Sequence, residues 1–247
     1  MKQLGLIGNP ISHSQSPALF QSFFKQFPLE KWSYDLFPLN DAIEIHELIQ
    51  NHPDLCGLNV TIPFKKQVLS LLHSLDVTAS ATQAVNTISI DRKGPEAILT
   101  GYNTDIYGFE NSLNAFGNFS NCQALILGNG GASLAVQFVL KKMNIPFLIV
   151  SRNSSEYALD YGALLPELVH QSELIINTTP LGMWPQIDSK PELPYSAISS
   201  RHFCFDLVYN PAQTLFLQKA AAKGSITVNG YSMLQLQADK SWEIWNS

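Results

Sequence analysis

Charged residues, cysteine and long apolar runs are all scarce in this sequence of 247 residues. Charged side chains account for 14% and apolar ones for 45%, and the mean hydropathy is +0.02. Such a chain can bury a large core, which excludes a disordered, collagenous or coiled-coil protein. The 15 Lys and Arg against 20 Asp and Glu leave a net charge of −5, which argues against non-specific binding to nucleic acid. No apolar run reaches the ~18 residues of a membrane-spanning helix.

The three cysteines, Cys56, Cys122 and Cys204, lie far apart and form no C-x-x-C pair. An odd and sparse set of this kind is typical of reduced thiols in the cytoplasm. The apolar stretch at residues 4–7 ends at Gly8 and is too short for a signal peptide. The six histidines are scattered and do not form an H-E-x-x-H motif. We therefore expect a cytoplasmic protein without a metal site.

Strand and helix patterns alternate along the whole chain, which predicts an α/β fold with mostly parallel, covered sheets. In the first half, strands are expected at 3–7, 32–37, 55–62 and 85–90, and helices at 16–27, after Asn40, from Pro63 and at 76–83. In the second half, strands are expected at 124–127, 147–150, 174–177 and 203–207, and helices at 106–116, 132–143, 212–223 and 232–245. We place the boundary between the halves near residues 103–105.

A glycine turn lies in the second half, where the strand 124–127 runs into Gly-Asn-Gly-Gly and then a helix. Glycines let a pyrophosphate approach the backbone amides at a helix N-terminus, because no side chain intervenes. A G-x-G-x-x-G motif alone is weak, and its sixth position here is Ser133. The strand, turn, helix and following strand nevertheless have suitable lengths. The sequence favours a dinucleotide site over a tight turn without a ligand.

The residues after the next strand indicate which dinucleotide is bound. Dinucleotide-binding halves selective for NAD usually carry Asp or Glu there, for the ribose 2′-hydroxyl. Here Ser151 and Arg152 follow, and no carboxylate appears before Glu156. An arginine can pair with a 2′-phosphate and stack beside adenine. This pattern favours NADP, with an ordinary surface arginine as the alternative.

Four polar clusters lie at strand ends or loops of the first half, where α/β proteins bind ligands. Ser14 and Ser16 place two hydroxyls beside a helix N-terminus, which suits a small carboxylate. The alternative is that Ser16 only caps its helix, with Pro17 as the first helical residue.

The second, third and fourth clusters, at residues 59–65, 84–87 and 101–105, supply amides, a hydroxyl, an amine and a carboxylate. Asn59 and Thr61 alternate onto one face at a strand end. Lys65 falls in the first turn of the helix expected at Pro63, where a positive charge opposes the helix dipole. Its alternative is a solvated lysine. Asn86 lies in the third cluster. Asp105 lies in the fourth cluster. Its alternative is a carboxylate that only stabilises the first turn of the following helix.

These clusters together resemble the shikimate dehydrogenases, which reduce 3-dehydroshikimate with NADPH. The motifs that carry the resemblance are GNPISHSQSP (8–17), NVTIPFK (59–65), AVNT (84–87), GYNTD (101–105), GNGGAS (128–133), NTTPLGM (177–183) and NGYSML with Gln237 (229–237). They occur in family order over nearly the whole chain, although they separate shikimate from quinate less well.

The resemblance implies roles for the matching residues. Lys65 and Asp105 would form the catalytic pair, with the lysine as the acid that protonates the carbonyl oxygen. Substrate would be held by Ser14, Ser16, Asn59, Thr61, Asn86, Tyr209 and Gln237. The dinucleotide would be held by Gly128, Asn129, Gly130, Gly131, Ala132, Ser151, Arg152, Thr178 and Gly230. A second basic residue that often helps to clamp the 2′-phosphate is not evident after Arg152.

The resemblance also implies two domains with the reaction in a cleft between them. Residues 1–104, completed by the helix 232–247, would bind substrate, and 105–231 would form a Rossmann-type NADP-binding domain. The implied partners are small molecules, without nucleic acid or membrane, in a monomer or homodimer. Three alternatives stay open: an NAD-using quinate/shikimate dehydrogenase, another two-domain NADP enzyme such as a methylene-tetrahydrofolate dehydrogenase, and a non-catalytic sensor of shikimate-like ligands.

Overall fold

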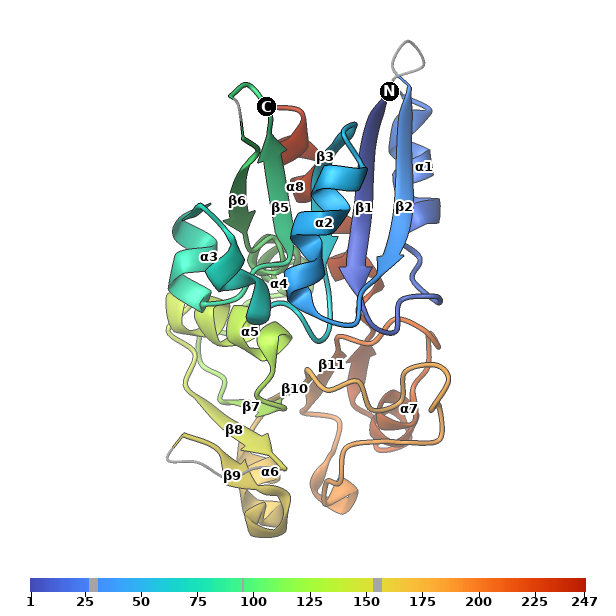
Figure 1. Ribbon diagram of the computed structural model, residues 1–247. Helices are drawn as coiled ribbons and strands as arrows, with labels where there is room; N and C mark the ends of the chain where they lie inside the picture. The colour runs from blue at the N-terminus through green and yellow to red at the C-terminus, as the bar shows by residue number, and fades with distance from the viewer. Residues whose placement is uncertain (27–30, 95, 153–156) are drawn as a thin grey trace. The chain divides into compact units, whose positions relative to one another are not determined.

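The computed structural model describes residues 1–26, 31–94, 96–152 and 157–247. Its chain divides into two compact units, one formed by Met1–Gly108 with Gln235–Ser247 and the other by Phe109–Leu234. Each unit contains a six-stranded sheet, and Figure 1 shows helices packed against both sheets. Both units are therefore α/β. Residue 27, the predicted end of the helix 16–27, lies outside the described residues. Residues 153–156, which follow Arg152, also lie outside them.

The first sheet has the strand order β2-β1-β3-β5-β6-β4. Its strands are β1 (Lys2–Gly8), β2 (Trp32–Pro38), β3 (Leu55–Val60), β4 (Ser74–Leu75), β5 (Thr87–Asp91) and β6 (Ile98–Tyr102). β1 is parallel to β2 and β3, and β4 is parallel to β6. β5 is antiparallel to both of its neighbours, so this sheet is mixed. Neither β4 nor β6 was predicted from the sequence. A short connection joins β5 to β6, and such a connection returns the chain antiparallel.

The two faces of the first sheet carry separate cores, because successive strand residues point to opposite faces. Ile7 packs in a cluster with α2 (Ile45–Asn51), whereas its neighbour Leu6 packs in a cluster with α1 (Ser16–Phe24). The second cluster also includes Trp242 and Trp245 of α8 (Tyr231–Trp245).

Two local expectations in the first unit are wrong. The helix predicted from Pro63 is a turn followed by a short 3₁₀ segment, η2 (Gln67–Leu71). Leu72 is already extended, and the amide of His73 pairs with the carbonyl of Leu99, so the chain joins the sheet region before an α-helix can form. Lys65 therefore does not lie in a helix, and the dipole argument does not apply to it.

Ser16 is also not the N-cap of its helix. Gln15 occupies the cap position, and α1 begins at Ser16 with Pro17 in its first turn. The amide of Ser16 instead donates to the Ser14 hydroxyl at 3.2 Å. The two serines therefore form one hydrogen-bonded group, rather than a helix cap and a bystander.

The second sheet is wholly parallel in its described pairings and has the order β12-β11-β10-β7-β8-β9. Its strands are β7 (Ala124–Leu127), β8 (Phe147–Ser151), β9 (Leu159–Asp160), β10 (Leu174–Asn177), β11 (Phe203–Asp206) and β12 (Ile226–Val228). Read from β9, this is the 3-2-1-4-5-6 order of a Rossmann sheet, with the switch point between β7 and β10. β7 and β10 are buried along their whole length, as expected for covered parallel strands.

The remaining helices complete the two units. They are α3 (Val77–Thr82), α4 (Asp105–Asn114), α5 (Gly131–Lys142), α6 (Pro166–Gln171) and α7 (Leu215–Ala221), with 3₁₀ segments η1 (Ala42–Glu44), η3 (Tyr161–Ala163) and η4 (Tyr195–Ala197). In the described residues, no helix combines the length and the apolar character that crossing a bilayer requires.

Candidate active site

A short ion pair joins Lys65 and Asp105 in the first unit. The ammonium Nζ lies 2.5 Å from Oδ2 of Asp105, and the two side chains are only 14% and 8% exposed. Lys65 lies in the turn after β3, and Asp105 is the first residue of α4, where a carboxylate is favoured by the helix dipole. Among the described residues, this bond uses one of the three ammonium hydrogens. The others are available to a ligand atom.

Asn86 holds the second oxygen of that carboxylate. Its Oδ1 accepts the backbone N–H of Thr104 at 2.7 Å, which fixes the orientation of the amide. Its Nδ2 consequently faces Asp105 and donates to Oδ1 at 3.0 Å. Both oxygens of Asp105 thus have a donor, and this carboxylate is held rigidly beside Lys65.

Gln237 brings the C-terminal helix to this group. Its Oε1 lies 3.4 Å from Nδ2 of Asn86 and 3.4 Å from the Thr104 hydroxyl. Asn59 is also buried, and its Nδ2 donates to the Asn86 carbonyl at 3.3 Å. The structure therefore brings together five of the predicted residues: Asn59, Lys65, Asn86, Asp105 and Gln237.

The serine pair and Thr61 are not hydrogen-bonded to that group in the described residues. The hydroxyls of Ser14 and Ser16 lie 3.1 Å apart. Thr61 is half-buried, and its methyl group occupies the space that a Cβ at Gly8 would need. The lack of a side chain at Gly8 thus lets the first loop approach the end of β3.

The glycine turn of the second unit fits a dinucleotide. Gly128 has a φ of +105°, which disfavours other residues, and a Cβ there would lie 2.8 Å from the Thr178 hydroxyl. A Cβ at Gly130 would instead meet nothing within 4 Å. Gly130 is the N-cap of α5 and supplies no side-chain acceptor to its first amides. An open backbone cradle with orphan amides is what a pyrophosphate requires.

The other predicted dinucleotide residues lie in the same unit. Ser151 ends β8 and is buried, and Arg152 is exposed immediately after it. Gly230 is buried, and the carbonyl of Leu207 fills the space that a Cβ would need. Packing alone therefore explains this glycine. Tyr209 is half-buried in the segment after β11.

Asp206, at the end of β11, is a buried carboxylate that the sequence analysis did not single out. Oδ1 accepts from Asn177 at 2.9 Å and from the amide of Val208 at 3.0 Å, and Oδ2 accepts from Thr214 at 2.5 Å. Burial raises the pKa of Asp206 to about 7, against the opposing effect of these hydrogen bonds. The carboxyl group joins the segments that follow β10 and β11.

Other polar residues at the first-unit site were also missed. They are Tyr34, Thr87 and Ser241, whose hydroxyls all lie within 3.2 Å of an Asn59 side-chain atom. Only the placement of Ser241, one helical turn after Gln237 on the same face, could have indicated it from the sequence.

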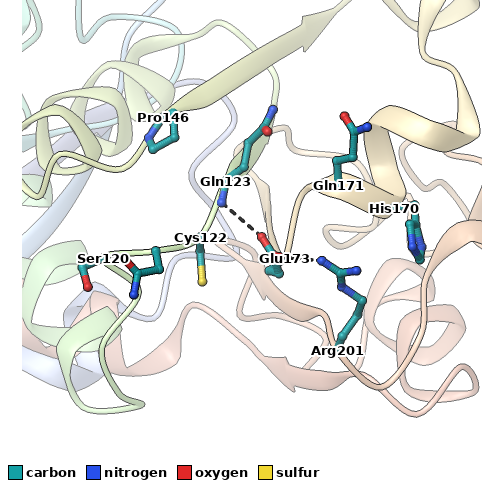
Figure 2. A pocket seen from close by; sticks show the side chains of 9 residues that line it. Ser120, Cys122, Gln123, Pro146, His170, Gln171, Glu173 and Arg201 are labelled. Carbon is teal, nitrogen blue, oxygen red and sulfur yellow. Dashed lines mark hydrogen bonds and ion pairs between the residues drawn. The ribbon is translucent and has the colours of Figure 1, made fainter.

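A separate open hollow of about 530 Å³ lies on the second unit (Figure 2). Glu173 and Arg201 form an ion pair of 2.5 Å there, and the amide of Gln123 donates to the same carboxylate. Burial would raise the pKa of Glu173, but the backbone hydrogen bonds and Arg201 outweigh it and lower that pKa. Gln123 and Glu173 directly precede β7 and β10. The hollow therefore lies at the N-terminal ends of these strands, whereas the glycine turn follows the C-terminal end of β7. It is not the candidate active site.

Comparisons with known proteins agree with these observations. The family model described as "Shikimate dehydrogenase substrate binding domain" matches residues 6–88. A protein named shikimate dehydrogenase (NADP(+)) from Pelagibacter ubique is 36% identical, over 98% of this chain and 92% of its own. A namesake from Methanococcus vannielii is 34% identical, over 98% of this chain and 90% of its own.

Solved structures give the same result. The crystal structure of shikimate 5-dehydrogenase from Thermus thermophilus, in complex with NADP(H) and shikimate, has a TM-score of 0.85 and 29% identity. The alignment covers 99% of this chain and 93% of that one. Full-length relatives above 30% identity, together with the shared two-unit fold, show that this chain belongs to the shikimate dehydrogenase family.

Proposed function

We propose that this protein is an enzyme that reversibly reduces 3-dehydroshikimate to shikimate with NADPH, a step of chorismate and aromatic amino-acid biosynthesis. The observation that carries the proposal is the buried Lys65–Asp105 pair, with Asn86 on the second carboxylate oxygen. A protein that only bound a shikimate-like ligand would not need an ammonium group held in this way. Family membership supports the substrate and the cofactor.

The first unit, Met1–Gly108 with Gln235–Ser247, would bind the substrate. The hydrogen-bonded hydroxyls of Ser14 and Ser16 suit the carboxylate of shikimate, with Tyr209 as a further contact. Thr61, Asn86 and Gln237 would bind the ring hydroxyls. Amides and hydroxyls can each donate and accept, as recognition of several hydroxyl groups requires.

Reduction of a ketone adds a hydride to carbon and a proton to oxygen, and NADPH would supply the hydride. Lys65 donates the proton to the carbonyl oxygen and is left as a neutral amine. Asp105 holds the ammonium group in place through its short bond. In the opposite direction, neutral Lys65 accepts the hydroxyl proton of shikimate while the hydride would pass to NADP⁺.

The second unit, Phe109–Leu234, would hold the dinucleotide. The amides from Gly128 to Ala132 would bind the pyrophosphate, and Thr178, whose hydroxyl donates to the Leu127 carbonyl at 2.8 Å, holds the turn in shape. Arg152, with Ser151 beside it, would contact the 2′-phosphate. The exposed guanidinium group directly after β8 supports NADP over NAD. Gly230 would lie near the nicotinamide.

The test is an assay of NADP⁺ and NAD⁺ reduction with shikimate or quinate as the second substrate. We expect the pair shikimate and NADP⁺ to give the highest kcat/KM. A higher value with quinate or NAD⁺ would assign the chain to the quinate/shikimate dehydrogenases that use NAD. Shikimate binding by calorimetry without turnover in any combination would instead indicate a sensor.

The proposal also covers location and assembly. A cytoplasmic location accords with the three free cysteines. The enzyme would act on small molecules as a monomer or homodimer. Light scattering of the purified protein measures the assembly directly.

A further inference from the structure

A buried polar network in the first unit has Ser241 at its centre. The proposed reaction gives this residue no role. It lies on α8 and is fully buried. Its hydroxyl donates to the carbonyl of Gln237, one turn earlier, at 2.9 Å. The same oxygen lies 2.8 Å from the Thr87 hydroxyl and 3.2 Å from the Thr104 hydroxyl. One side chain thus connects the C-terminal helix to β5 and to the loop that precedes α4.

Asn59 is fully engaged in the same network. Its Oδ1 accepts from the Tyr34 hydroxyl at 2.8 Å. Its Nδ2 faces three acceptors: the Ser241 hydroxyl at 3.1 Å, the Thr87 hydroxyl at 3.2 Å and the Asn86 carbonyl at 3.3 Å. An amide nitrogen has only two hydrogens, and the residue is 5% exposed. Asn59 therefore has no donor left for a ring hydroxyl, which is the role that the family resemblance implied.

We propose that Ser241 and Asn59 are positioning residues that hold Gln237 and Asn86 in the geometry required to bind the substrate ring. Because Ser241 has given its one hydrogen to the Gln237 carbonyl, it must accept from Asn59. This bond fixes the rotation of α8 and keeps Oε1 of Gln237 beside Asn86. The inference rests on the proposed function, since shikimate is the ligand on which these groups act.

A buried network also stabilises a fold, so stability and positioning have to be separated. A residue that only satisfies buried polar groups lowers the melting temperature when it is truncated and leaves KM unchanged. A positioning residue also shifts KM for the ligand whose contacts it orients. Removing the Ser241 hydroxyl takes away one of the three acceptors of Asn59 Nδ2 and the 2.8 Å partner of the Thr87 hydroxyl, and both side chains then reorient toward the partners that remain.

The experiment compares Ser241→Ala with Ser172→Ala. Ser172 is a matched control because it is also fully buried and donates to the carbonyl four residues earlier, that of Leu168, at 2.8 Å, but lies in the second unit. We expect Ser241→Ala to raise KM for shikimate about fivefold, with KM for NADP⁺ unchanged. Ser172→Ala should lower the melting temperature to a similar extent without changing KM for shikimate.

Tyr34→Phe tests the other end of the network and covers the case in which Ser241→Ala does not fold. The substitution removes one hydroxyl and keeps the ring, which stacks on Phe20 with centroids 4.4 Å apart. It should also raise KM for shikimate, by about threefold. In the double variant, the increase should be smaller than the product of the two single effects, because both act through Asn59.

The outcomes separate this inference from the proposed function. A wild-type protein that neither binds nor oxidises shikimate contradicts the proposed function and, with it, the positioning role. An active wild-type protein whose KM for shikimate is unchanged in both Tyr34→Phe and Ser241→Ala overturns the positioning role alone. Equal rises in KM for shikimate and in KM for NADP⁺ would also overturn it, because a general distortion of the protein would then explain the result.

Discussion

At the scale of single residues, the site depends on one cation and one anion that are both largely removed from water. Burial of either charge alone is unfavourable, and the 2.5 Å contact between Lys65 and Asp105 offsets that cost for both. Asn86 satisfies the remaining oxygen of the carboxylate. The ammonium group keeps hydrogens that this bond does not use, and the proposed mechanism assigns one of them to the carbonyl oxygen of the substrate.

We expect Lys65→Ala to lower kcat at least about 100-fold, because a general acid typically contributes that much or more. Lys66→Ala is the matched control, since Lys66 is the next residue in the chain, carries the same charge and is exposed. Steady-state kinetics of shikimate oxidation measure kcat for both variants, and circular dichroism checks that they fold. A loss of less than about tenfold in Lys65→Ala would show that another group supplies the proton.

At the scale of elements, two glycines of one turn carry different requirements. At Gly128, the positive φ and the nearby Thr178 hydroxyl leave no room for a side chain, so the fold itself requires glycine. At Gly130, φ is −89° and a Cβ would meet nothing. The protein alone would tolerate another residue there. The proposed pyrophosphate site would give this second glycine its function, because a side chain there would stand between the phosphate and the backbone amides.

Gly130→Ala should therefore leave the melting temperature almost unchanged and raise KM for NADP⁺ at least about tenfold, through a methyl group placed against the pyrophosphate. Gly128→Ala is the contrasting variant and should lower the melting temperature, because its backbone conformation is strained. Thermal melts and kinetics with NADP⁺ measure both effects. Normal affinity for NADP⁺ in Gly130→Ala would remove the turn from the proposed binding site.

Elements with a strong local pattern were predictable from the sequence, and those decided by neighbours were not. The apolar runs at β7 and β10 gave the observed bounds, 124–127 and 174–177. The helix expected from Pro63 does not form, although the apolar residues have helical spacing, because the chain is already extended at Leu72, where it joins the sheet. β6 was missed because Gly101 interrupts a short run, and its absent side chain makes room for Leu72 and Val85.

At the scale of the molecule, the buried carboxylate of Asp206 makes stability depend on pH. Its pKa is about 7 in the folded protein and 3.8 in the exposed reference state. Between these values the folded state binds more protons than the unfolded state, so this group lowers the free energy of unfolding as pH rises from about 4 to about 7. The largest effect is about 4 kcal/mol.

Asp206→Asn should remove this part of the pH dependence. The amide oxygen can accept from Asn177 and Val208, and its NH₂ group can face the Thr214 hydroxyl. Denaturant unfolding at several pH values between 4 and 8 measures the slope in both proteins. An equal slope in the variant and the wild type would show that Asp206 does not titrate in this range.

The candidate site was predictable in its composition but not in its connections. Motif order identified Lys65 and Asp105 although they are distant in the chain, and the structure places them in contact. The spacing of Ser241 from Gln237 places both on one face of α8, but the contacts of Ser241 with Asn59, Thr87 and Thr104 depend on tertiary packing that the local sequence does not show. The positioning role that we propose for Asn59 was not predictable for the same reason, since one of the acceptors of its Nδ2 is Ser241, which the motifs do not include.

The discontinuous first unit has a consequence for synthesis on the ribosome. Residues 109–234 are contiguous and are translated before residues 235–247. The unit that starts first is therefore the last to finish, since it waits for the segment that carries Ser241 and Trp245. A chain truncated before residue 235 would keep every strand of the second sheet and would lose the segment that packs Trp242 and Trp245 against the core of the first unit.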